Sequence, residues 1–151
     1  MTIDELDLSP VAKHAATLLK AAHPEVVFTS GRRDLAGQAR AMASNVVHNR
    51  QWIATTYKDT PQRDALQDCV DGCAANSNQA VYSAALLDVM QDWDDAELSH
   101  VSKHLSGDAF DVQPFEGPTA AAVKASIRGL PGLTLFLEKE GGLVRWHAQF
   151  A

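Results

Sequence analysis

The residues best suited to chemistry lie in one short segment and near the C-terminus. His104 and Asp111 are seven positions apart, and a second histidine, His147, follows close to the end of the chain. Two imidazoles and one carboxylate are the protein ligands of an open zinc site, in which water takes the fourth coordination position. The three residues therefore predict a catalytic metal centre with Zn²⁺ as its cofactor. Each ligand also needs a hydrogen-bond partner that fixes its orientation, and Ser102 is a candidate.

Composition sets the class of protein in which this centre would lie. The chain has 151 residues, of which 46% are hydrophobic, so residues 1–151 are expected to form a single domain with its own core. The net charge of −6 and the scattered basic residues speak against a nucleic-acid partner. The acidic N-terminus does not resemble a signal peptide, and no apolar run reaches the roughly 20 residues of a membrane span. We therefore expect a cytoplasmic monomer without stable membrane association.

Local patterns indicate which elements hold the candidate ligands. Helical periodicity and capping residues predict helices over about 10–23, 34–57, 66–73, 81–90 and 117–129. Strand-like runs cover 26–29, 109–112, 133–140 and 143–150. Helices dominate the first part and strands cluster late. The predicted class is therefore α+β: a small, mostly antiparallel sheet with helices packed on one side and a helical insertion at about 51–97.

The last two strands have a clear turn signal between them. Gly141-Gly142 predicts a two-residue hairpin turn that pairs 133–140 with 143–150. This register places Glu138 opposite Arg145 and Phe136 opposite His147. Because side chains two apart share a face, Glu138 is expected on the face of His147.

The segment around His104 resembles the signature of a known family. Ser102, His104, Gly107, Ala109 and Asp111 match the Ser-x-His-x-x-Gly-x-Ala-x-Asp motif of the D-Ala-D-Ala carboxypeptidase family of zinc peptidases. This family belongs to a wider group with lysostaphin-type and Hedgehog-type zinc folds. Residues 29–33 resemble its Ser-Gly-x-Arg segment, and Trp146-His147 resembles the pair that carries the third ligand. The resemblance spans roughly 26–150, apart from the helical stretch.

The resemblance implies roles for further residues. Arg33 would bind substrate and stabilise charge at the reacting carbonyl, and the other substrate-binding candidates are Gln38, Ser102 and Trp146. The family usually has an acidic general base three positions before the last histidine, where this chain has Val144. Glu138 is the candidate replacement and Glu140 the reserve.

The family cleaves stem-peptide bonds of bacterial peptidoglycan that involve D-amino acids. Small size and the missing signal favour a phage endolysin-like enzyme, which cuts L-Ala–D-Glu or D-Ala-containing bonds after release to the wall. One alternative is a cytoplasmic D-Ala-D-Ala dipeptidase or carboxypeptidase. A second is a non-catalytic, zinc-bound wall-binding or virion module, which Val144 motivates.

Ordinary structural roles are the alternative for most of these residues. His104 with Asp111 can form a buried hydrogen-bonded pair, and His147 can pack in the core. Glu138 and Arg145 can form an exposed ion pair worth under about 1 kcal/mol. Arg33 can be a surface residue, with Arg32 competing for its role. Two cysteines, at 69 and 73, are expected to be reduced thiols.

Overall fold

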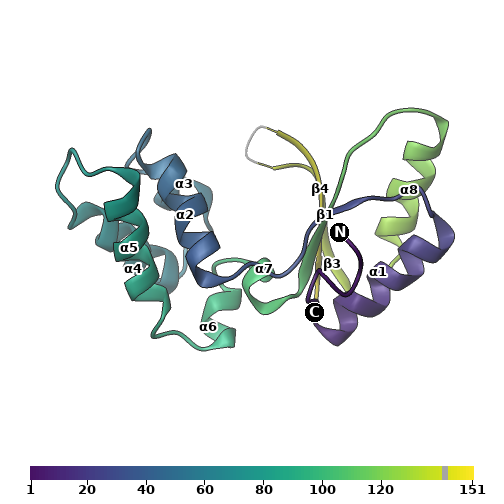
Figure 1. Ribbon diagram of the computed structural model, residues 1–151, viewed down its shortest axis with the longest axis horizontal. Coiled ribbons are helices and arrows are strands. Elements are labelled where there is room, and N and C mark those ends of the chain that lie inside the picture. Colours follow the sequence, from purple (N-terminus) through teal and green to yellow (C-terminus); the bar gives the residue numbers. More distant parts are fainter. Residues whose placement is uncertain (141–142) are drawn as a thin grey trace. The chain divides into compact units, whose positions relative to one another are not determined.

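The computed structural model describes residues 1–140 and 143–151 (Figure 1). The chain divides into two compact units, the first comprising Met1–Arg32 with Ser106–Ala151 and the second Arg33–Leu105. The predicted helical insertion at about 51–97 lies within the second unit. That the whole chain forms a single domain stays a prediction. None of the described helices is long and apolar enough to cross a membrane.

The first unit contains an antiparallel sheet, as predicted. Its described strands are β1 (Phe28–Ser30), β2 (Ala109–Val112), β3 (Leu133–Glu140) and β4 (Leu143–Phe150). They lie in the order β1-β2-β4-β3, and each neighbouring pair is antiparallel. The long-range pairing of β2 with β4 places β4 inside the sheet, so the C-terminal strand is held on both edges.

Two helices, α1 (Pro10–Ala22) and α8 (Pro118–Arg128), cover one face of this sheet (Figure 1). Each begins with a proline in its first turn, where a missing N–H costs nothing. Their apolar sides enclose a core with Phe110, Trp146, Ala148 and Phe150. Because successive strand residues point to opposite faces, the neighbours Asp111 and His147 project from the other face.

The second unit is helical within its described residues. It contains α2 (Leu35–Val46), α3 (Trp52–Thr56), α4 (Pro61–Asp71), α5 (Gln79–Met90) and α6 (Asp95–Ser99), and α7 (Lys103–Ser106) leads back into the first unit. The helices enclose a second apolar core. Side chains at the residues before α2, α4, α5 and α6 accept hydrogen bonds from the first turn of each helix.

The helix predicted over 34–57 is two helices, because the chain turns after Val46. The amides of His48 and Asn49 bond to carbonyls three residues back, which tightens the helix end. The Asn49 side chain then accepts from the Gln51 amide before α3 begins. These backbone bonds and the Asn49 side chain therefore end a helix that apolar periodicity alone would continue.

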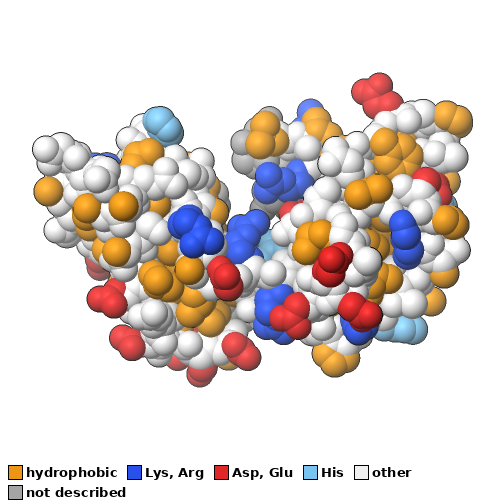
Figure 2. All heavy atoms as spheres, viewed as in Figure 1, with side chains coloured by type: hydrophobic (Ala, Val, Ile, Leu, Met, Phe, Trp, Pro, Cys, Tyr) orange, Lys and Arg blue, Asp and Glu red, His pale blue; other side chains and the backbone are white. Residues whose placement is uncertain are grey.

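Surface charge on the second unit is mainly acidic in the view of Figure 2. Acidic side chains gather along its lower edge. This distribution agrees with the net charge of −6.

The register of the β3–β4 hairpin differs from the prediction. Glu140 pairs with Leu143 as expected, but Leu137, not Phe136, pairs with His147. The pairing shifts between Leu137 and Lys139, where β4 contributes one extra residue. A one-residue slip moves side chains to the opposite face. The predicted Gly141-Gly142 turn itself lies outside the described residues.

Gly31 provides a test of how β1 is anchored. A Cβ at Gly31 would lie 2.7 Å from the Leu6 Cα, and the next amide, of Arg32, donates to the Leu6 carbonyl. We expect Gly31→Ala to lower the free energy of unfolding by about 1–3 kcal/mol, because this close backbone approach is lost. Urea unfolding followed by circular dichroism would measure the change.

The matched control is Gly129→Ala. Its Cβ would meet nothing closer than 3.7 Å, so its effect should stay within about 0.5 kcal/mol. Equal urea midpoints for the two variants would contradict a tight contact at Gly31.

Candidate metal centre

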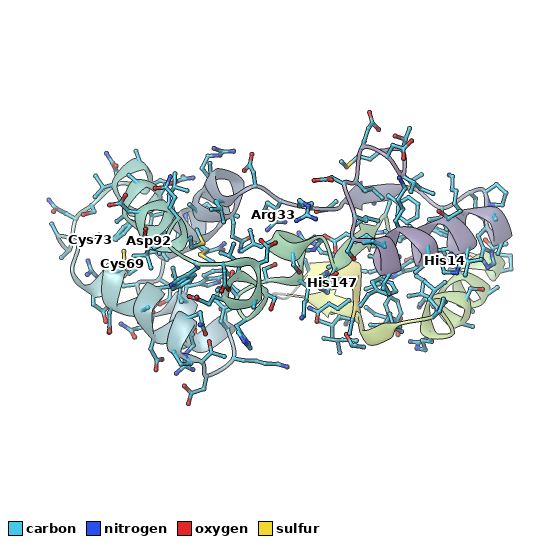
Figure 3. All side chains as sticks on the ribbon, turned by 90° about the horizontal axis from the view of Figure 1, so that it is seen from below. His14, Arg33, Cys69, Cys73, Asp92 and His147 are labelled. Atoms are coloured by element: carbon cyan, nitrogen blue, oxygen red, sulfur yellow. The ribbon has the colours of Figure 1, made fainter. Side chains whose placement is uncertain are left out.

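Two candidate ligands face each other across neighbouring strands. Asp111 of β2 and His147 of β4 are directly paired, and paired residues of antiparallel strands share a face. The Nδ1 atom of His147 lies 2.7 Å from Oδ1 of Asp111. His147, labelled in Figure 3, is only 2% exposed, and Asp111 is 3% exposed. The sheet thus brings an imidazole and a carboxylate together away from solvent.

His104 completes the group. It lies in α7, is 5% exposed, and offers a ring nitrogen within 4.8 Å of the Asp111 and His147 ligand atoms. The three residues predicted as ligands are therefore a buried group that can bind a metal ion. Neutral imidazole and carboxylate suit zinc, and they also suit other first-row divalent ions.

The backbone conformation at position 107, between His104 and Asp111, explains why a glycine lies there. Gly107 has a φ of +79°, a conformation that side chains disfavour. A Cβ there would also lie 2.7 Å from the Arg32 guanidinium, while the Gly107 carbonyl accepts from the Ser9 amide. The turn from α7 into β2 thus depends on glycine at this position.

Ser102 acts on the backbone of the ligand segment. Its Oγ accepts from the amide of His104 at 3.3 Å, at the start of α7. This contact positions His104 through the main chain, as an N-cap would. A direct contact between Ser102 and substrate stays a prediction.

Arg33 and Gln38, both predicted to bind substrate, are in contact within the second unit. The Arg33 Nη1 donates to Gln38 Oε1 at 2.9 Å, and Gln38 Nε2 donates to the Tyr57 hydroxyl at 3.2 Å. Gln38 is 2% exposed, so the series of hydrogen bonds from Arg33 to Tyr57 is anchored in the unit's interior. The Arg33 amide also donates to the carbonyl of His104. Sequence reasoning missed Tyr57 because nothing local links it to Gln38.

Arg32, the competitor of Arg33, has a structural role. Its Nε lies 3.0 Å from the Asp7 carbonyl and 2.9 Å from the Asp7 carboxylate. Arg32 therefore fastens the N-terminal segment within the first unit. The substrate-binding role of Arg33 stays a prediction.

The prediction that Glu138 shares the face of His147 is wrong. Its carboxylate accepts from Lys124 at 2.7 Å and from Arg128 at 2.6 Å, and both cations belong to α8. Glu138 therefore lies on the helix-covered face, and the predicted pairing with Arg145 is replaced by these two contacts. The hydrogen bond from Lys124 is the largest effect and lowers the pKa of Glu138. Desolvation opposes it, and the charge of Lys124 and the contact with Arg128 lower the pKa further. The geometric argument for Glu138 as the general base is lost.

Of the two other positions considered for the base, only Val144 has a described side chain. Val144, which stands where the family has an acid, is 62% exposed. Glu140 has a described backbone, but its side chain lies outside the described residues. Among the described residues, Asp111 is the only carboxylate in the metal-binding group.

Trp146 also lies on the helix-covered face. It is 3% exposed, its ring centroid is 5.2 Å from that of Phe115, and Lys124 lies over it at 5.5 Å. With Glu138 it lines an open pocket of about 420 Å³. The indole therefore packs on the face opposite His147, and its contact with substrate stays a prediction.

The two cysteines are free thiols, as expected. Cys73 Sγ contacts the Cys69 carbonyl at 3.4 Å in the second unit (Figure 3). Burial raises the pKa of Cys69, which lowers its thiolate fraction. Neither belongs to the metal-binding group found among the described residues.

Comparison with known proteins gives no relative: no family model, curated protein or solved structure matches the chain. The likeness to the zinc peptidases therefore depends on the motif residues and on their convergence in space.

Removing any one ligand should release the metal. We expect His104→Ala, Asp111→Ala and His147→Ala each to lower bound zinc from about one equivalent per chain towards zero, because two ligands hold zinc poorly. Metal analysis after dialysis would measure this. His14→Ala, an exposed histidine on α1, is the control and should keep its zinc. Full zinc retention in the three ligand variants would contradict the assignment.

Glu138→Gln should affect stability and not zinc content. The lowered pKa of Glu138 means that its ion pairs stabilise the fold above the ordinary pKa of 4.5. This contribution is lost as the pH falls through the lower folded-state pKa. The stability difference from the natural chain should therefore be largest at neutral pH and shrink in acid. Urea midpoints against pH test this, and zinc loss in Glu138→Gln would restore a role at the metal.

Proposed function

We propose that the chain is a zinc-dependent peptidase that cleaves peptidoglycan stem-peptide bonds involving D-amino acids. One observation carries the proposal. The residues that match the family's ligands, His104, Asp111 and His147, have ligand atoms within 4.8 Å of one another and are all buried. This convergence is not implied by the motif alone, since His147 is 36 residues from Asp111.

The donor set suits the proposed chemistry. Three protein ligands would leave one coordination position for water, and zinc when bound lowers the pKa of such a water towards about 7 and polarises a carbonyl. His104, Asp111 and His147 would hold the ion. Their burial excludes bulk water, which strengthens electrostatic interactions at the group.

Arg33 is the proposed substrate-binding residue. A guanidinium can donate two parallel hydrogen bonds to a carboxylate, and it can stabilise charge that develops on a peptide carbonyl. The Arg33–Gln38–Tyr57 chain fixes one edge of this guanidinium before substrate arrives. Pre-orientation lowers the entropy lost on binding.

The biological setting remains part of the proposal. An endolysin-like monomer would be made in the cytoplasm and reach the wall after release, without binding nucleic acid or a membrane. A D-Ala-D-Ala dipeptidase or carboxypeptidase would use the same ligands on a small soluble peptide.

The lack of an acid at position 144 and the position of Glu138 favour one further candidate function. Val144 replaces the family's acid, and Glu138 pairs with α8 on the other face of the sheet. A ligand group without an acid at position 144 and without Glu138 on its face suits a zinc-bound module that retains stem peptides without cutting them.

Mass spectrometry of purified muropeptides tests these functions together. We expect the zinc-loaded protein to release shortened stem peptides whose masses identify the bond, because the ligand group matches the family's. Asp111→Ala is the control and should release none. Activity on free D-Ala-D-Ala alone would indicate the dipeptidase.

Retention on peptidoglycan without products would indicate the binding module. Equal product formation by the natural chain and Asp111→Ala would contradict a metal-dependent reaction at this group.

A further inference from the structure

Both ring nitrogens of His147 have polar neighbours. Nδ1 lies 2.7 Å from Asp111 Oδ1, and Nε2 lies 2.9 Å from Nε2 of Gln149. Gln149 is two residues further along β4, so it shares the face of His147. The sequence did not indicate a role for Gln149, because a lone glutamine belongs to no recognisable motif.

The orientation of the Gln149 amide in this structure matches one tautomer of the ring. The amide Nε2 of Gln149 is a donor only, so it donates to Nε2 of His147. With the amide in this orientation, the single proton of a neutral imidazole would lie on Nδ1 and be donated to Asp111. In this tautomer Nδ1 has no lone pair for a metal.

Metal binding requires the other tautomer. Nδ1 is the nitrogen beside Asp111, a second member of the metal-binding group, and is therefore the atom placed to bind the ion. The ring would lose its proton at Nδ1 and carry one at Nε2 instead, with no net gain or loss of protons. Nε2 would then become a donor, and the neighbouring amide would have to accept.

Gln149 can meet both requirements without moving its backbone. It pairs with Ala109 on one side and with Leu135 on the other, and its carbonyl accepts from the Thr134 hydroxyl at 3.2 Å. A half-turn of its terminal amide replaces Nε2 by Oε1 in nearly the same place. The fixed strand thus supplies a donor to one tautomer of His147 and an acceptor to the other.

We propose that Gln149 is a positioning residue of the metal centre, whose amide accepts from Nε2 of His147 and holds Nδ1 ready for the metal. The proposal rests on the metal site of the proposed function, and it does not depend on peptide cleavage. Partners of this kind orient metal-bound histidines and commonly contribute roughly 10- to 100-fold to metal affinity.

Three substitutions separate hydrogen bonding from packing. Gln149→Met keeps a side chain of similar length without an acceptor of comparable strength, and it should raise the Kd for zinc by roughly 10- to 100-fold. Gln149→Glu can only accept when ionised, and it should bind zinc at least as tightly as the natural chain. Gln113→Met changes an exposed glutamine just after β2 and should leave the Kd unchanged.

Two measurements test the proposal. Competition with a chromophoric chelator gives the zinc Kd of each variant, and urea midpoints show whether each is folded. Nitrogen-15 NMR of the zinc-loaded natural chain should show the His147 proton on Nε2. A Gln149→Met Kd equal to that of the natural chain, a proton on Nδ1 in the zinc-loaded state, or no zinc binding by the natural chain would each overturn it.

The outcomes separate this proposal from the peptidase. If Gln149→Met weakens zinc binding, Gln149→Glu restores it and no muropeptide is cut, the positioning role stands and the peptidase does not. If muropeptides are cut while Gln149→Met keeps the natural Kd, the peptidase stands alone.

Discussion

The pairing of Asp111 with His147 is the constraint on which the candidate site depends. A buried carboxylate is costly unless a partner compensates the loss of water, and here the partner comes from the neighbouring strand. The long-range β2–β4 pairing that creates this contact also buries Phe110 and Trp146 under α1 and α8. Because strand residues alternate between faces, Asp111 and His147 must then lie on the face opposite the helices. The register between β2 and β4 therefore determines both the packing of the core and the placement of the ligands.

The same alternation explains why Glu138 is unavailable to the ligands. The extra residue in β4 shifts the pairing between Leu137 and Lys139, so Leu137 takes the position opposite His147. Glu138 then points to α8, where Lys124 and Arg128 bind both of its oxygens. A carboxylate held by two cations stays ionised, yet its lone pairs are occupied. Because of the bulge, Glu138, the residue considered for catalysis, instead links the sheet to α8.

Local patterns predicted the fold class and the residues of the metal-binding group. Prolines, capping residues and strand alternation indicated the α+β class, and the Ser102–Asp111 segment with His147 indicated the metal-binding group. What sequence could not give depends on contacts between distant residues. The bulge at Leu137 needs the paired strand, and the Gln38–Tyr57 bond needs α2 and α3 folded together. The proposed role of Gln149 can be recognised only once the tautomer of His147 is considered.

Holding a metal and turning over a substrate draw on different residues in this chain. The ligand group depends on β2, β4 and α7, and none of these needs an acid at position 144. A positioned general base contributes typically about 10²- to 10⁴-fold to a rate, so its loss slows a reaction without abolishing metal binding. The electrostatic contribution of a residue such as Arg33 is separate again. A chain with intact ligands and Val144 is thus consistent with a slow peptidase and with a binding module, and the distinction lies in the group that takes the proton.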